Sequence, residues 1–168
     1  MGSYNEGKDK AVAWLCANFS KGSTCLDVGA CDGKWSNLLN DYFYMDAVEV
    51  WEPYIKKNKL ADKYAHVYFI DIRDFKFARY DIIIFGDILE HLPVADAQKV
   101  IEYAWPRCKQ MLIAVPFLYA QGKKNGNPHE VHQQPDLTPD LFDARYPGFI
   151  PIYMSEGYAY YIKDLRNL

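Results

Sequence analysis

Four carboxylates recur along the first half of the chain, and each follows a short apolar run. They are Asp27, Glu49, Asp71 and Asp87, which lie 22, 22 and 16 residues apart. One acid at the end of a strand is commonly the N-cap of the next helix, but four caps explain such a series poorly. Carboxylates at these positions can accept hydrogen bonds from the hydroxyl and amino groups of a nucleoside. The series therefore predicts a nucleoside-binding site.

The turn after the first acid has small residues that let the backbone approach a ligand closely. It reads Asp27-Val28-Gly29-Ala30-Cys31-Asp32-Gly33, and a helix-like segment begins at Lys34. Glycine removes the Cβ that would block a ligand, and the start of a helix offers free N–H groups. A dinucleotide fingerprint needs glycine at 31 and 34, and a phosphate loop needs glycine at 34 and lysine at 35. Neither pattern fits, so the turn is predicted to serve a ligand without a phosphate.

Two segments resemble motifs of the class I S-adenosylmethionine (SAM) methyltransferases. The turn D-x-G-x-x-x-G is similar to their motif I, D-x-G-x-G-x-G, with Cys31 in place of the middle glycine. The segment Gly86-Asp87-Ile88-Leu89-Glu90-His91-Leu92 resembles the D-x-L-E-H-L that follows their fourth strand. The resemblance runs from about residue 20 to 165 and implies SAM as the cofactor. The residues that it implies for cofactor binding are Asp27, Gly29, Ala30, Cys31, Gly33, Glu49, Val50, Trp51, Asp71, Ile72, Asp87 and Ile88.

The resemblance also assigns a part of SAM to each group of residues. The Asp27–Gly33 turn would line the methionine part, and Glu49 would take the ribose hydroxyls, with Val50 or Trp51 on the adenine face. Asp71 would accept from the adenine amino group while Ile72 covers the ring. Asp87 would lie near the amino group of SAM and the methyl group.

A polar loop over residues 117–137 is expected on the substrate side, because such a long connection is usually functional or disordered. It contains His129-Glu130-Val131-His132, although the whole chain has only four histidines. His129 and His132 are therefore the candidate catalytic residues, as general bases. They could instead pin the loop to the backbone. With Glu90 and His91 they also resemble the E-x-x-E-H plus histidine metal site of small-RNA 2′-O-methyltransferases; the prediction retained is no metal.

The elements that position these residues alternate between strand-like and helix-like segments. Asp81 leads into Ile82-Ile83-Ile84-Phe85, a run that is apolar on every side and typical of a central strand covered on both faces. Such alternation predicts an α/β fold with a parallel sheet and right-handed crossovers. The resemblance implies a three-layer, Rossmann-like, seven-stranded sheet, mostly parallel with a C-terminal antiparallel hairpin. The strands are expected at 24–28, 47–50, 67–70, 82–85, 111–115, 149–154 and 158–163, and the helices at 5–20, 34–42, 53–64, 93–109 and 139–145.

Composition indicates one soluble domain over residues 1–168, with an N-terminal helical segment (1–22) and the substrate-side loop (117–137). The chain is 50% hydrophobic and 24% charged, with a net charge of −3 that argues against a nucleic-acid partner. No apolar run approaches 18 residues, so no membrane partner is expected. The four cysteines form no C-x-x-C pair. Reduced thiols in a cytoplasmic protein are expected, with Cys16 and Cys108 in helices.

These observations predict SAM-dependent methyl transfer to an oxygen or nitrogen of a small-molecule acceptor, by in-line displacement. The alternatives are an RNA (2′-O) or protein methyltransferase, and a SAM-binding subunit without turnover. An NAD-binding Rossmann protein is disfavoured by the glycine spacing. The acceptor, the methylated atom and the oligomeric state stay open at this point.

Overall fold

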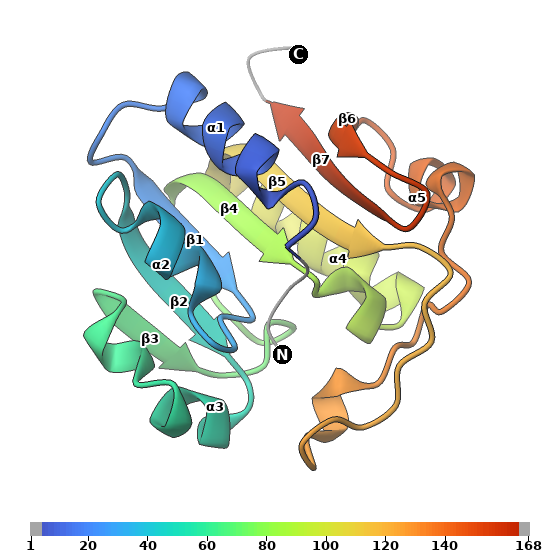
Figure 1. Ribbon diagram of the computed structural model, residues 1–168, viewed down its shortest axis with the longest axis horizontal. Helices are drawn as coiled ribbons and strands as arrows, with labels where there is room; N and C mark the ends of the chain where they lie inside the picture. The colour runs from blue at the N-terminus through green and yellow to red at the C-terminus, as the bar shows by residue number, and fades with distance from the viewer. Residues whose placement is uncertain (1–4, 165–168) are drawn as a thin grey trace.

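Seven strands form one sheet in the order β3-β2-β1-β4-β5-β7-β6 (Figure 1). The computed structural model describes residues 5–164 of the chain. The first five strands are parallel, whereas β7 runs antiparallel to both β5 and β6. The predicted seven-stranded α/β sheet with its C-terminal hairpin is therefore confirmed. The strands are β1 (Thr24–Val28), β2 (Tyr44–Glu49), β3 (His66–Phe69), β4 (Tyr80–Gly86), β5 (Cys108–Pro116), β6 (Ile150–Met154) and β7 (Tyr158–Asp164).

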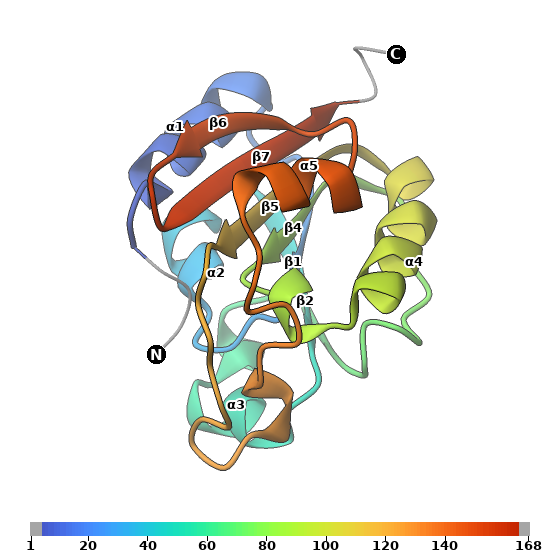
Figure 2. The same cartoon turned by 90° about the vertical axis from the view of Figure 1, so that its right-hand side faces the viewer.

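Helices cover both faces of the sheet, which makes three layers (Figure 2). On one face lie α1 (Lys8–Asn18), α2 (Lys34–Leu39) and α3 (Glu52–Lys57). On the other lie α4 (Val94–Ala104) and α5 (Pro139–Arg145), whose buried side chains share one hydrophobic cluster. Within residues 5–164, every helix is too short or too polar to cross a membrane.

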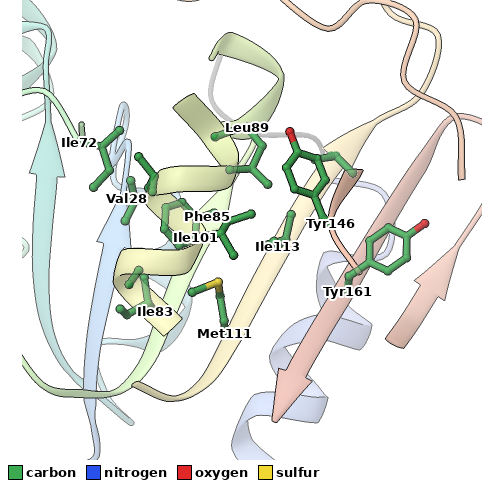
Figure 3. Close-up of a cluster of buried hydrophobic side chains, with 14 of the residues drawn as sticks. Val28, Ile72, Ile83, Phe85, Leu89, Ile101, Met111, Ile113, Tyr146 and Tyr161 are labelled. Carbon is green, nitrogen blue, oxygen red and sulfur yellow. The ribbon is translucent and has the colours of Figure 1, made fainter. Parts of the chain in front are cut away.

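The central strands bury both of their faces, which explains their unbroken apolar sequence. Side chains alternate along a strand, so Ile83 and Phe85 of β4 join the cluster under α4 while Ile82 and Ile84 join the cluster under α1 and α2. Figure 3 shows Ile83 and Phe85 beside Ile101 of α4. The sheet is thus fixed rigidly between two cores, and its strand ends form a firm base for a site.

Two predicted helices end five or more residues earlier than expected. The helix expected at 53–64 stops at Lys57, because Lys59 has a positive φ of 50° and a separate 3₁₀ turn follows at Leu60–Asp62. The helix expected at 93–109 stops at Ala104, because a 3₁₀ turn containing Pro106 follows and proline cannot continue an α-helix. Cys108 therefore begins β5 and does not lie in a helix.

The other boundaries agree with expectation to within a few residues. The strand expected at 24–28 and the helix expected at 139–145 match, and Thr138 caps that helix by accepting from Leu141 N at 3.2 Å. The N-terminal helix spans Lys8–Asn18 where 5–20 was expected. The first four residues of the predicted 1–22 segment lie outside the described residues.

The segment 117–137 is a long loop, as expected. It leaves the carboxyl end of β5 and reaches α3, as the orange trace shows in Figures 1 and 2. Its regular structure is limited to a 3₁₀ turn at Pro128–Glu130 and an isolated bridge between Lys124 and Asn127. The loop therefore passes over the strand ends where the site was predicted.

Candidate functional site

A cavity of about 460 Å³ opens at the carboxyl ends of the parallel strands. Its walls come from the turn after β1, from the ends of β2, β3 and β4, and from the long loop after β5. Of the predicted site residues it is lined by Gly29, Ala30, Cys31, Glu49, Val50, Asp71, Ile72, Asp87, Ile88, His129 and His132. Asp27, Gly33 and Trp51 do not line it. Three of the four predicted carboxylates are thus brought together around one space.

The turn after β1 uses left-handed backbone at three positions. Gly29, Cys31 and Gly33 have φ values of 73°, 47° and 74°. A Cβ at Gly29 would overlap Cδ1 of Ile88, so glycine is needed there for packing as well as for backbone conformation. Cys31 holds the conformation despite its side chain, and burial raises the pKa of its thiol to about 12. A thiol with that pKa is a poor nucleophile.

Glu49 ends β2 and fixes this turn. Its side chain is 4% exposed; Oε2 accepts from Cys31 N at 2.9 Å and Oε1 accepts from Trp51 N at 2.8 Å. Burial raises the pKa of this carboxyl, and the hydrogen bonds from the backbone oppose the rise without cancelling it. Each carboxylate oxygen has a second lone pair, so Glu49 retains capacity to accept from a ligand in the cavity.

Asp71 follows β3 and forms an ion pair with Arg73. The guanidinium donates from Nε at 2.9 Å and from Nη2 at 2.6 Å, and it also contacts Asp96 at 3.4 Å. The hydrogen bond from Arg73 lowers the pKa of Asp71. Asp71 is therefore a fixed carboxylate on the wall of the cavity.

Asp27 lies beneath the cavity and is 1% exposed. Its Oδ2 accepts from the hydroxyl of Tyr64 at 2.5 Å, and its Oδ1 has no hydrogen-bond partner among the described residues. Burial raises the pKa of this carboxyl to about 7. The sequence prediction placed Asp27 against the ligand, whereas the structure places it in the layer that supports the turn.

Two supporting side chains for Asp87 could not be found from the local sequence. Asp87 has a positive φ of 59°, and its Oδ1 accepts from the hydroxyl of Tyr158 in β7 at 2.6 Å. Lys8 of α1 is buried with Nζ 4.4 Å from the ring centre of Trp35; burial lowers the pKa of Lys8 to about 8, and the negative charge of Asp87 opposes that shift. Tyr158 and Lys8 belong to β7 and α1, which are far along the chain from the segment that contains Asp87. The pairing of β7 with β5 is what brings Tyr158 to this end of β4.

The long loop is tied to α3 over the cavity. Glu130 accepts from the hydroxyl of Tyr54 at 2.9 Å and from Nε2 of Gln121 at 3.0 Å. The ring of His129 lies 6.2 Å from that of Trp51. His129 is exposed and on the cavity wall, so it is accessible to a second ligand.

A second group of side chains gathers where the loop meets the segment after β4. Glu90, His91 and His132 place one potential ligand atom each so that all three lie within 4.8 Å of one another. The two imidazole rings are 4.7 Å apart, centre to centre. Glu90 is 1% exposed, and no described residue hydrogen-bonds either of its carboxylate oxygens. The structure thus separates the two candidate histidines: His132 joins this group and His129 does not.

No protein-family model matches this sequence, and no curated protein sequence matches it significantly. Solved structures do match it. DhpI in complex with SAH (S-adenosylhomocysteine) aligns with a TM-score of 0.74 at 14% identity, over 94% of this chain and 83% of that one. A SAM-dependent methyltransferase from Clostridium acetobutylicum aligns with a TM-score of 0.72 at 10% identity, over 96% and 92%.

A third match is magnesium protoporphyrin IX methyltransferase from Synechocystis with bound SAM. It aligns with a TM-score of 0.64 at 16% identity, over 92% of this chain and 76% of that one. The chain therefore has the Rossmann-like fold of the class I SAM-dependent methyltransferases, as the sequence predicted.

Proposed function

We propose that this protein is a SAM-dependent methyltransferase that acts on an oxygen or nitrogen of a small-molecule acceptor. One observation carries the proposal: a single cavity meets Glu49, Asp71 and Asp87 at the ends of β2, β3 and β4, beside the turn at Gly29 that follows β1. Ligands of open α/β sheets bind outside the carboxyl ends of the strands. The methyltransferase fold and the two SAH- and SAM-bound neighbours support the same choice of cofactor.

The residues present suit SAM in size and chemistry. A cavity of about 460 Å³ falls within the range that holds drug-sized ligands. Glu49 would hold the ribose hydroxyls, Asp71 the adenine amino group and Asp87 the amino group of the methionine part. Val50 and Ile72 would cover the base. When bound, SAM supplies a methyl group on a positively charged sulfur, which is a good leaving group.

The protein then has to orient the acceptor and keep water out. The loop anchored by Glu130 would cover the acceptor, since it spans the cavity from β5 to α3. Tyr158 would hold the Asp87 carboxylate in one orientation. Holding the acceptor and the methyl group in line can provide a large part of the rate acceleration. His129 is the candidate to accept a proton from a poorly nucleophilic acceptor, because it is exposed on the cavity wall.

The cofactor is tested by thermal unfolding in the presence of SAM, SAH or NAD. A ligand that binds only the folded state at 100 times its Kd stabilises it by about 2.7 kcal/mol. We expect SAM and SAH to raise the melting temperature and NAD to leave it unchanged. A rise with NAD alone, or with none of the three, would contradict the proposal.

The reaction is tested with methyl-labelled SAM and a panel of acceptors that includes small phenols, amines and RNA. We expect label in a small-molecule hydroxyl or amine. Label in RNA alone would overturn the acceptor class but keep methyl transfer. Binding of SAM with no transfer to any acceptor would identify a SAM-binding subunit.

A further inference from the structure

We propose that Glu90, His91 and His132 bind one divalent transition-metal ion on the acceptor side of the cavity. The inference deepens the proposed function and rests on it for its role, since the metal would hold the acceptor of methyl transfer. The binding site itself stands on the geometry of these three side chains.

The carboxylate of Glu90 requires a partner that the described part of the chain does not provide. It is 1% exposed, and neither oxygen accepts a hydrogen bond from any residue between 5 and 164. Buried carboxylates are normally paired with a charge, hydrogen-bonded or bound to a metal. Its oxygens lie within 4.8 Å of two imidazole nitrogens, where a cation would be shared by all three.

Both histidines are oriented as metal ligands usually are. Nδ1 of His132 lies 2.6 Å from the carbonyl oxygen of Tyr119, and Nδ1 of His91 lies 3.4 Å from that of Val131. A carbonyl only accepts, so each Nδ1 carries the proton and each Nε2 keeps its lone pair. A second hydrogen bond of this kind fixes the tautomer and orientation of metal-bound histidines.

The backbone holds the two segments together before any ion binds. The N–H of Gln133, the residue after His132, donates to the carbonyl of Glu90 at 2.7 Å. The buried amide of Gln134 donates to the carbonyls of Leu89 and Leu92 at 2.8 and 3.0 Å. These bonds place the histidine of the loop beside the Glu90-His91 pair. Ligand atoms around one ion lie about 3–4.4 Å apart, close to the 4.8 Å within which the three potential ligand atoms lie.

Two imidazoles and one carboxylate favour iron(II), cobalt(II), zinc or manganese(II) over magnesium or calcium. Three protein ligands leave coordination positions open. All three residues line the cavity, so an open position faces the space next to the cofactor site. A hydroxyl bound there is oriented and acidified by the ion, which points to a hydroxylated small molecule as the acceptor.

The test is binding of Co²⁺ and of Zn²⁺ to the full chain without SAM, by calorimetry and by the visible absorption of Co²⁺. We expect one ion per chain. Loss of a partner outside the coordination shell costs ~10- to 100-fold in metal affinity, so loss of a ligand through Glu90→Gln or His132→Asn is expected to cost at least as much. His129→Asn removes a histidine from the same loop outside the group and is the matched control for metal binding.

Circular dichroism of each variant checks that it is folded. If Glu90→Gln does not fold, His132→Asn still tests the site, because His132 lies at a half-buried position in a loop. Equal Co²⁺ affinity in the wild type and His132→Asn would overturn the site, as would an equal loss in His129→Asn. SAH binding is measured on the same samples. SAH binding without metal binding overturns this inference alone, whereas metal binding without SAH binding overturns the proposed cofactor and leaves the metal site standing.

Discussion

The buried carboxyl of Asp27 should make the stability of this protein fall as pH rises. Burial raises its pKa to about 7, and neighbouring Glu49 and Asp32 act in the same direction. The hydrogen bond from Tyr64 and the charge of Lys8 oppose the shift without cancelling it. In the unfolded chain an aspartate has a pKa of about 3.9. The folded state therefore binds the proton more tightly than the unfolded state.

The sign and size follow from proton linkage. Where the folded state binds more protons, the free energy of unfolding decreases with pH. The loss begins near the unfolded pKa and is complete above the folded pKa of about 7. A difference of about three pKa units corresponds to about 4 kcal/mol in all, of which about 3 kcal/mol falls between pH 4 and pH 7.

Asp27→Asn removes the titration and keeps an oxygen that can accept from Tyr64. The assay is urea unfolding of both proteins at half-unit steps from pH 4 to pH 7, a range below the pKa of Lys8, which burial lowers to about 8. The difference in unfolding free energy between the two proteins is expected to change by about 3 kcal/mol across this range, in favour of the variant at pH 7. Asp41→Asn, at an exposed position, makes the same change in net charge and is the control.

A constant offset between Asp27→Asn and the wild type at every pH would refute this reasoning. The offset itself carries no information, because an amide in place of the carboxyl adds a fixed cost of its own. The pH-dependent part isolates the burial of the charge.

Three further predictions concern the cavity and its loop. Glu49→Ala is expected to weaken SAH binding by about 1–3 kcal/mol, the scale of a lost hydrogen bond to a charged group; calorimetry with affinity unchanged would remove Glu49 from the site. Gly29→Ala is expected to destabilise the fold by about 2–5 kcal/mol through left-handed backbone strain and overlap with Ile88, and Ile88→Ala in the same chain should recover part of the loss in urea unfolding. Tyr54→Phe removes the hydroxyl that ties the loop to α3 through Glu130 and should speed hydrogen exchange across residues 121–132, by about fivefold for a bond of ~1 kcal/mol.

The sheet could be predicted because its signals are local. The continuous apolar run of β4 identifies a strand buried on both faces, and each predicted acid lies within two residues of the end of its strand. The helix ends were harder, since the positive φ at Lys59 depends on packing that the sequence does not display. Pro106, by contrast, is a visible stop signal that accounts for the early end of α4.

The site was predicted as far as neighbouring residues define it. The sequence could not predict which side chains of the turn face the cavity. Asp27 was therefore expected against the ligand, although it lies beneath the cavity. The side chains that hydrogen-bond these carboxylates come from distant elements. Tyr64 is 37 residues from Asp27 along the chain, and Tyr158 is 71 residues from Asp87. No spacing rule connects residues so far apart, because the fold alone brings them together.

The most direct measurement is a crystal structure of the protein grown with SAH. The account predicts density for the nucleoside in the cavity, with the ribose hydroxyls at Glu49 and the adenine amino group at Asp71. Density for SAH elsewhere on the protein, or an empty cavity at saturating SAH, would contradict it.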